Sequence, residues 1–151
     1  ATTILTIKMK NLDKKKTILS KEKINFHLKR SRYLFNEFYI TSQKYKFISY
    51  LRRNATGWLI MNIMMEYYFE NKELRVETLA SKITSKVCSR ATLLSMLKSA
   101  EIRKIIKKTK GQIDKRARII TPTEEFIDEF NKWTDEFYDS EGYKLKKEYK
   151  I

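Results

Sequence analysis

Residues 82–118, KITSKVCSRATLLSMLKSAEIRKIIKKTKGQIDKRAR, decide the fold of this chain. They hold 12 of its 33 lysine and arginine residues and only two acids, Glu101 and Asp114. In order, the stretch reads as the end of a short helix, a tight turn, a second amphipathic helix and a basic β-hairpin. This order is that of a helix-turn-helix followed by a wing. Because such a module commonly binds duplex DNA, double-stranded DNA is the expected partner.

The local signals place each element of this stretch. Residues 77–83 are predicted to form a two-turn helix and residues 84–88 a turn, and Ser89 caps the helix that follows. In that second helix the apolar spacing predicts four core-facing residues, which are Leu93, Leu94, Met96 and Leu97. Two β-prone runs come next, at 104–108 and 116–121, and Gly111 is the only glycine between them. Pro122 is expected to end the second run.

Helical patterns flank this stretch on both sides. Apolar residues recur at three- and four-residue steps over 21–51, which predicts one long helix capped by Ser20 and bent near 41–42. A nearly all-hydrophobic helix around Trp58 is predicted to begin at Asn54 or Thr56, followed by a short extended connection at 74–76. Thr123 caps an acidic final helix over 124–141, whose apolar seam consists of Phe126, Phe130, Trp133 and Phe137.

Composition narrows the class of protein. Three glycines and one proline in 151 residues are too few for a β-sandwich or barrel, so long helices are expected. A single cysteine excludes an intrachain disulfide, no apolar run is long enough to span a bilayer, and no signal peptide is evident. These features predict a cytoplasmic protein without a membrane partner. The net charge of +15 favours a polyanionic partner, and its concentration in 82–118 favours DNA.

The sequence offers no pattern for catalysis. His27 has neither a second histidine nor a nearby cysteine, and the carboxylates of 124–141 have the spacing of a solvated helix face. No phosphate-binding loop, zinc spacing or nucleophile elbow occurs, so we expect no enzyme activity, no cofactor and no metal. Cys88, at the turn before the second helix, suits either a small core residue or a redox-sensitive thiol.

The run 76–123 resembles the winged helix of the multiple-antibiotic-resistance-regulator (MarR) family of transcriptional regulators. The resemblance is carried by Leu79-Ala80, by SRATL at 89–93, by DKRA at 114–117 and by TPTE at 121–124. The family's usual glycine after the recognition helix is absent, so a different helix end is expected. The resemblance implies a mainly α fold with a small β-hairpin wing, flanked by N- and C-terminal dimerisation helices, and therefore a homodimer.

The expected domain organisation follows from the sequence patterns together with the family resemblance. Residues 1–19 form a flexible arm, and 20–151 form one winged-helix domain with a DNA-binding core at 55–122 and dimerisation helices at 20–53 and 123–151. The predicted homodimer reads a pseudo-palindromic duplex site, with the recognition helix in the major groove and the basic wing in the minor groove. Asp114 is expected to orient the wing. The expected DNA contacts are Lys82, Lys86, Ser89, Arg90, Thr92, Ser95, Lys108, Lys110, Lys115, Arg116 and Arg118.

Alternatives to a sequence-specific regulator stay open at this stage. A winged helix also suits a non-regulatory DNA role, such as replication initiation or nucleoid packing, and it suits a protein-interaction module. Aromatic side chains between the long helix and the Trp58 helix suit either core packing or a pocket for a small-molecule effector. The operator, the target genes and the sign of regulation do not follow from the sequence.

Overall fold

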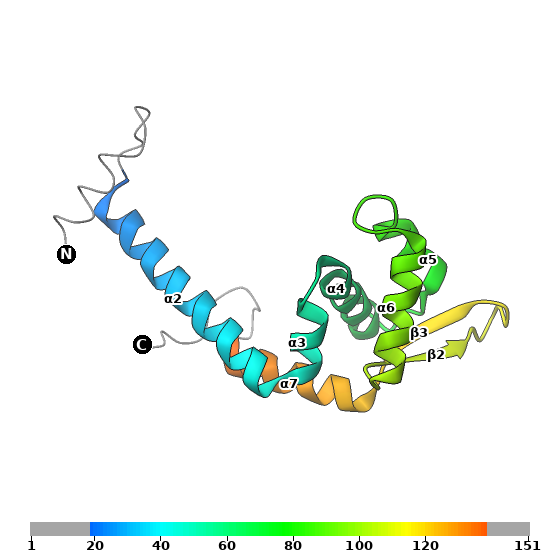
Figure 1. Ribbon diagram of the computed structural model, residues 1–151. Coiled ribbons are helices and arrows are strands. Elements are labelled where there is room, and N and C mark those ends of the chain that lie inside the picture. Colours follow the sequence, from blue (N-terminus) through cyan, green and yellow to red (C-terminus); the bar gives the residue numbers. More distant parts are fainter. Residues whose placement is uncertain (1–18, 139–151) are drawn as a thin grey trace.

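The computed structural model describes residues 19–138. Helices α4, α5 and α6 and a small sheet form the body, the hairpin of β2 and β3 projects from one side, and α2 projects from the other (Figure 1). The described residues therefore have the mainly α winged helix-turn-helix fold that the sequence predicts. In chain order the elements are α2 (Lys21–Lys44), α3 (Lys46–Arg52), α4 (Ala55–Phe69), β1 (Leu74–Arg75), α5 (Val76–Ile83), α6 (Arg90–Ile102), β2 (Ile106–Lys110), β3 (Arg118–Pro122) and α7 (Glu124–Phe137).

The long N-terminal helix is interrupted at Tyr45. We expected one helix over 21–51 with a bend near 41–42, but α2 ends at Lys44 and α3 begins at Lys46. Tyr45 is almost fully buried, and its hydroxyl donates a hydrogen bond to Glu136 of α7 at 3.0 Å. Glu129 of the same helix accepts a hydrogen bond from the Ile48 N–H at 2.9 Å and so caps α3. The break therefore depends on α7, which lies about 90 residues further along the chain.

The core is built around α4, which is apolar on nearly every side. Ile60, Met61 and Met64 are buried there, and they pack in one cluster with the inner faces of α5, α6, α7 and the sheet. Gly57 lets the start of α4 approach the end of α3, because a Cβ atom at this position would lie 2.4 Å from the Leu51 carbonyl oxygen. As predicted, α4 is capped by the side chain of Asn54.

The sheet has three strands in the order β1-β3-β2, all antiparallel. The connection at 74–76 is thus partly a strand, since Leu74 pairs with Ile120 and Arg75 with Ile119. Both hairpin strands begin two residues later than the runs predicted at 104–108 and 116–121. The first strand starts late because Lys104 and Ile105 still belong to the end of α6, where their N–H groups bond to the carbonyls of Glu101 and Ala100.

That end of α6 corrects a second expectation. We expected a different helix end because the glycine common in the resembling family is missing. The two hydrogen bonds instead form the usual left-handed helix terminus, and Lys104 occupies the glycine position with φ of 62°. The chain therefore keeps the turn and accepts backbone strain at a lysine.

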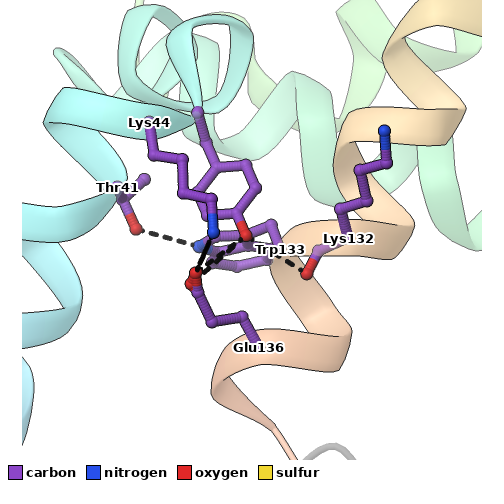
Figure 2. A network of polar contacts seen from close by, with 6 residues as sticks. Thr41, Lys44, Lys132, Trp133 and Glu136 are labelled. Carbon is purple, nitrogen blue, oxygen red and sulfur yellow. Dashed lines mark hydrogen bonds and ion pairs between the residues drawn. The ribbon is translucent and has the colours of Figure 1, made fainter.

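A polar network fixes the end of α2 to α7 (Figure 2). The Trp133 indole N–H lies 3.0 Å from both the Glu37 carboxylate and the Thr41 hydroxyl, and Arg52 pairs with Glu37 through two 2.7 Å contacts. Lys44 and Glu136 form an ion pair at 2.8 Å. An ion pair thus joins the basic N-terminal helix to the acidic final helix.

The N-terminal half of α2 extends beyond this network. Of its residues 21–32, all are exposed except the half-buried Ile24. Among residues 19–138, no helix combines the length and the apolar character that crossing a bilayer requires. The final helix was predicted over 124–141, but α7 ends at Phe137 and Tyr138 is its extended C-cap. The predicted arm at 1–19, except for Leu19, and residues 139–141 lie outside the described residues.

Candidate nucleic-acid interface

Helix α6 presents one face to solvent and buries the other. Leu93, Leu97 and Ala100 are completely buried, and they anchor the helix on the core. The line directly opposite is exposed and consists of Ala91, Ser95, Lys98 and Ile102. Leu94, which we expected to face the core, is 40% exposed, because the core-facing stripe follows 93, 97 and 100 and leaves 94 on the flank.

The first turn of α6 is organised by Ser89, as predicted. Its side chain accepts a hydrogen bond from the Thr92 N–H at 3.1 Å, and the two hydroxyl groups lie 3.0 Å apart. Both residues are exposed. Their hydroxyl groups and the free N–H groups of this helix end form a site suited to a phosphate oxygen.

Arg90, one of the expected DNA contacts, has a partner in the free protein. Its guanidinium forms two hydrogen bonds with the Glu77 carboxylate of α5, at 2.6 and 3.1 Å, and both side chains are exposed. The hydrogen bonds and charge of Arg90 lower the pKa of Glu77. The pair restrains the Arg90 side chain and cancels part of its charge.

The wing has a closed tip. The Gly111 N–H bonds to the Ala117 carbonyl at 3.0 Å, and the Asp114 carboxylate accepts a hydrogen bond from the Arg116 N–H at 3.0 Å. A Cβ atom on Gly111 would lie 2.5 Å from the Asp114 carbonyl oxygen, so only glycine fits there without a shift. Asp114 therefore holds the backbone that carries Arg116.

A cleft runs between α6 and the wing and brings four of the predicted residues together. Arg90, Lys108, Arg116 and Arg118 line it, with Asp114 at its edge. Arg75 of β1 lines the cleft as well. We did not anticipate this residue, because it reaches the wing only through the pairing of β1 with β3. The acids of the cleft are Glu77, Glu101 and Asp114, so its basic groups outnumber its acidic ones.

The remaining predicted residues lie outside that cleft. Lys82, Lys86, Lys110 and Lys115 are all exposed. The Lys82 ammonium lies 6.0 Å from the centre of the Tyr67 ring, and Lys110 lines a separate hollow together with Tyr67. Lys98, on the most exposed line of α6, was missed. The 3.6-residue period points to it once Leu93, Leu97 and Ala100 are recognised as the inner stripe.

Two further side chains were singled out from the sequence. Cys88 is half-buried in the turn between α5 and α6 and packs against the core. His27 is exposed on α2, edge to face with Phe26. Across the part of the chain that the structure describes, no group of three or more His, Cys, Asp or Glu side chains is arranged to hold a metal ion.

Several solved proteins have a similar layout. The transcriptional regulator Tm0710 from Thermotoga maritima shares 17% identity and a TM-score of 0.47 over 76% of this chain and 67% of its own. YusO from Bacillus subtilis shares 14% identity and a TM-score of 0.46, over 78% and 77%. Overoxidized AbfR bound to DNA shares 24% identity and a TM-score of 0.43, over 76% and 74%.

These solved proteins are regulators of the MarR family, the family that the motifs in residues 76–123 resemble. No protein-family model matches the chain, and no curated protein sequence matches it. The likeness is one of fold.

Proposed function

We propose that this chain is a DNA-binding transcriptional regulator that acts as a homodimer on a pseudo-palindromic duplex site. The observation that carries the proposal is the basic cleft between the exposed face of α6 and the wing. A helix with short polar side chains at its first turn fits the major groove, and a basic hairpin beside it reaches the adjacent minor groove. The net charge of +15 adds long-range attraction to the duplex.

The proposed DNA contacts fall into two groups: some residues read the base sequence, and others hold the protein on the phosphate backbone. Arg90 offers the planar pair of donors that recognises O6 and N7 of guanine, after it exchanges Glu77 for the base. Ser95 faces the groove floor, while Ser89 and Thr92 bind phosphate at the helix N-terminus. Arg116 enters the minor groove, where a narrow AT-rich segment concentrates negative potential. Lys82, Lys86, Lys108, Lys110, Lys115 and Arg118 contribute phosphate contacts that carry no sequence information.

The proposed division of the chain follows from the same picture. Residues 55–122 act as the DNA-binding core, and the segments 20–53 and 123–151 act in dimerisation. Two copies would present their α6 helices about one turn of DNA apart, which matches a two-fold symmetric site.

The test is selection of bound sequences from random duplex DNA at physiological salt. A regulator of this kind enriches a short palindromic consensus, whereas a protein that packs DNA enriches none. The affinity for the selected site should then fall steeply between about 50 and 200 mM salt, because several phosphates are neutralised. An affinity that does not change over this range contradicts the proposal.

A double variant links the activity to the cleft. Arg90→Ala with Arg116→Ala should abolish the preference for the selected site while the circular dichroism spectrum stays that of the wild type, since both side chains are exposed. Lys72→Ala with Lys132→Ala is the control. It removes the same charge from two exposed ion pairs away from the cleft. Equal loss in both variants would point to a general charge effect rather than to this interface.

A further inference from the structure

We infer that Tyr50, Arg53 and Arg103 form a second phosphate-binding site, for the DNA backbone on the flank of α6 opposite the wing. The inference rests on the proposed function. It names a partner group for three residues that are not among the DNA contacts expected from the sequence. They come from the end of α3 and the end of α6.

The two guanidinium groups are organised around one aromatic ring. The Arg103 guanidinium carbon lies 3.9 Å from the centre of the Tyr50 ring, and that of Arg53 lies 5.8 Å from the same centre. The ring is half-buried, and the Tyr50 and Ser99 hydroxyl groups are 2.5 Å apart, which ties α3 to α6. Stacking on a fixed ring restricts an arginine before any ligand arrives, so less conformational entropy is lost on binding.

Neither arginine is neutralised within the described residues. No carboxylate between residues 19 and 138 forms an ion pair with Arg53 or Arg103, and both are exposed. The neighbouring Arg52 differs, because it is mostly buried and held by Glu37 at 2.7 Å. Arg52 therefore serves the fold, while Arg53 and Arg103 keep their full charge and their donors for an external anion.

The position of this cluster matches the geometry of a helix in the major groove. Met96, Ser99 and Arg103 follow one flank of α6, while Arg90, Leu94 and Glu101 follow the other flank beside the wing. In Figure 1, α3 and the wing likewise lie on opposite sides of α6. The major groove is about 12 Å wide, so a helix inside it has a phosphate backbone on each side.

The chemistry favours a phosphodiester. A guanidinium presents parallel N–H donors that match two phosphate oxygens, and it holds that geometry better than an ammonium. The flank of α6 beside the wing meets one DNA strand, and the Tyr50 cluster on the opposite flank meets the other strand. The recognition helix is thus clamped between two cationic supports, which fixes its depth and angle in the groove.

The test compares three forms of the full chain on the selected duplex and on a random duplex. Arg53→Ala with Arg103→Ala should weaken both affinities by the same factor, roughly tenfold, because phosphate contacts carry no sequence preference. The slope of log affinity against log salt should become shallower by about 1 to 2. The control Lys72→Ala with Lys132→Ala should keep the wild-type slope.

A conservative pair separates geometry from charge. Arg53→Lys with Arg103→Lys keeps both charges but loses the planar stacking, so it should keep most of the salt slope and recover only part of the affinity. Arginine side-chain Nε–Hε signals of the wild type should shift on adding duplex DNA and not on adding inorganic phosphate alone. A shift with inorganic phosphate but not with duplex would overturn the assignment to the DNA backbone.

The outcomes distinguish this site from the wider proposal. If the wild type binds duplex DNA but the double alanine variant has unchanged affinity and slope, the second site is wrong and the proposed function stands. If the wild type binds no duplex DNA, the proposed function fails and takes this site with it.

Discussion

Lys104 holds a left-handed backbone conformation that a glycine would hold without strain. Its φ is 62°, and it sits where α6 turns into β2. The cost for a residue with a Cβ atom is about 1–2 kcal/mol, offset in part by the greater freedom that glycine has in the unfolded chain. Lys104→Gly should therefore raise the free energy of unfolding by about 1 kcal/mol, measured by urea denaturation.

The matched control for Lys104 is a lysine three residues later. Lys107→Gly places glycine within β2 opposite Thr121, where the backbone is extended. It should lower stability by about 0.5–1 kcal/mol. A loss of stability in both variants would show that the lysine at 104 makes a stabilising contact that outweighs its backbone strain.

Glu77 is placed to restrain the recognition arginine. It pairs with Arg90 through two hydrogen bonds, and its negative charge lies at the cleft that we propose for DNA. Glu77→Gln should strengthen binding to random duplex several-fold, since a repulsive charge is removed. It should also lower the ratio of the affinity for the selected site to that for random duplex, because an Arg90 without its carboxylate partner can contact the phosphates of any sequence. Fluorescence anisotropy with both duplexes measures the two effects, and Glu73→Gln is the control at another exposed acid. An unchanged ratio of the two affinities would rule out a role for Glu77 in discrimination.

The helix caps could be predicted from the sequence, because each depends only on residues close together in the chain. The caps at Ser20, Asn54, Ser89 and Thr123 are all present, because each depends on a side chain and an N–H three residues away. Leu94 and Arg75 were missed because their exposure and neighbours depend on tertiary contacts. The Glu77–Arg90 pair, which spans the helix-turn-helix, has no signature in the sequence.

At the scale of elements, α3 depends on a carboxylate from another helix. Its N-cap, Tyr45, makes no side-chain cap hydrogen bond, and Glu129 of α7 bonds to the Ile48 N–H instead. Burial raises the pKa of Glu129, and backbone hydrogen bonds from α3 offset only part of that rise. Between the unfolded pKa near 4.5 and the raised folded pKa, the folded state holds more protons, so this group's contribution to stability falls as pH rises.

Glu129→Gln should remove that dependence. Urea unfolding of the wild type and the variant from pH 4 to pH 7 gives two curves of unfolding free energy against pH. Their difference should change in the interval just above pH 4.5, with the wild type losing stability relative to the variant as pH rises. Curves that stay parallel through the interval would mean that Glu129 titrates alike in the folded and unfolded chains.

The order and type of the elements could be predicted, but some of their ends could not. Hydrophobic period and turn residues gave the helices, the wing and the turn at 84–88. The interruption at Tyr45 was placed too early because no Gly or Pro marks it and its cause lies in α7. Both strands were predicted to begin two residues too early, and β2 starts late because Lys104 and Ile105 complete the end of α6. Residues 74–76 were predicted only as an extended connection, because a two-residue strand such as β1 exists only through its partner β3.

At the scale of the whole molecule, charged residues occupy two regions, the proposed DNA face around α6 and the scaffold where α2 meets α7. The cleft and the Tyr50 cluster lie on the two flanks of α6, while the acidic α7 faces the basic end of α2. Glu136 of α7 is thereby paired on the scaffold, and the acids at the proposed DNA face are Glu77, Glu101 and Asp114 of the cleft. The N-terminal half of α2 extends beyond this scaffold, and its residues 21–32 are exposed except for the half-buried Ile24.

The exposed apolar side chains of α2 provide the test of the proposed homodimer. Phe35 is 62% exposed and stacks on Tyr39, and Phe38 is 57% exposed beside them. A contiguous aromatic surface of this kind is usually covered by another subunit. Phe35→Glu should convert the dimer to a monomer in sedimentation velocity experiments. It should weaken binding to the palindrome far more than binding to a single half-site, because a monomer contacts only one half-site at a time. Phe69→Glu removes an equally exposed phenylalanine, 60%, from α4 and should leave the dimer intact. If Phe35→Glu sediments as the wild type does, the aromatic surface of α2 is not the subunit interface.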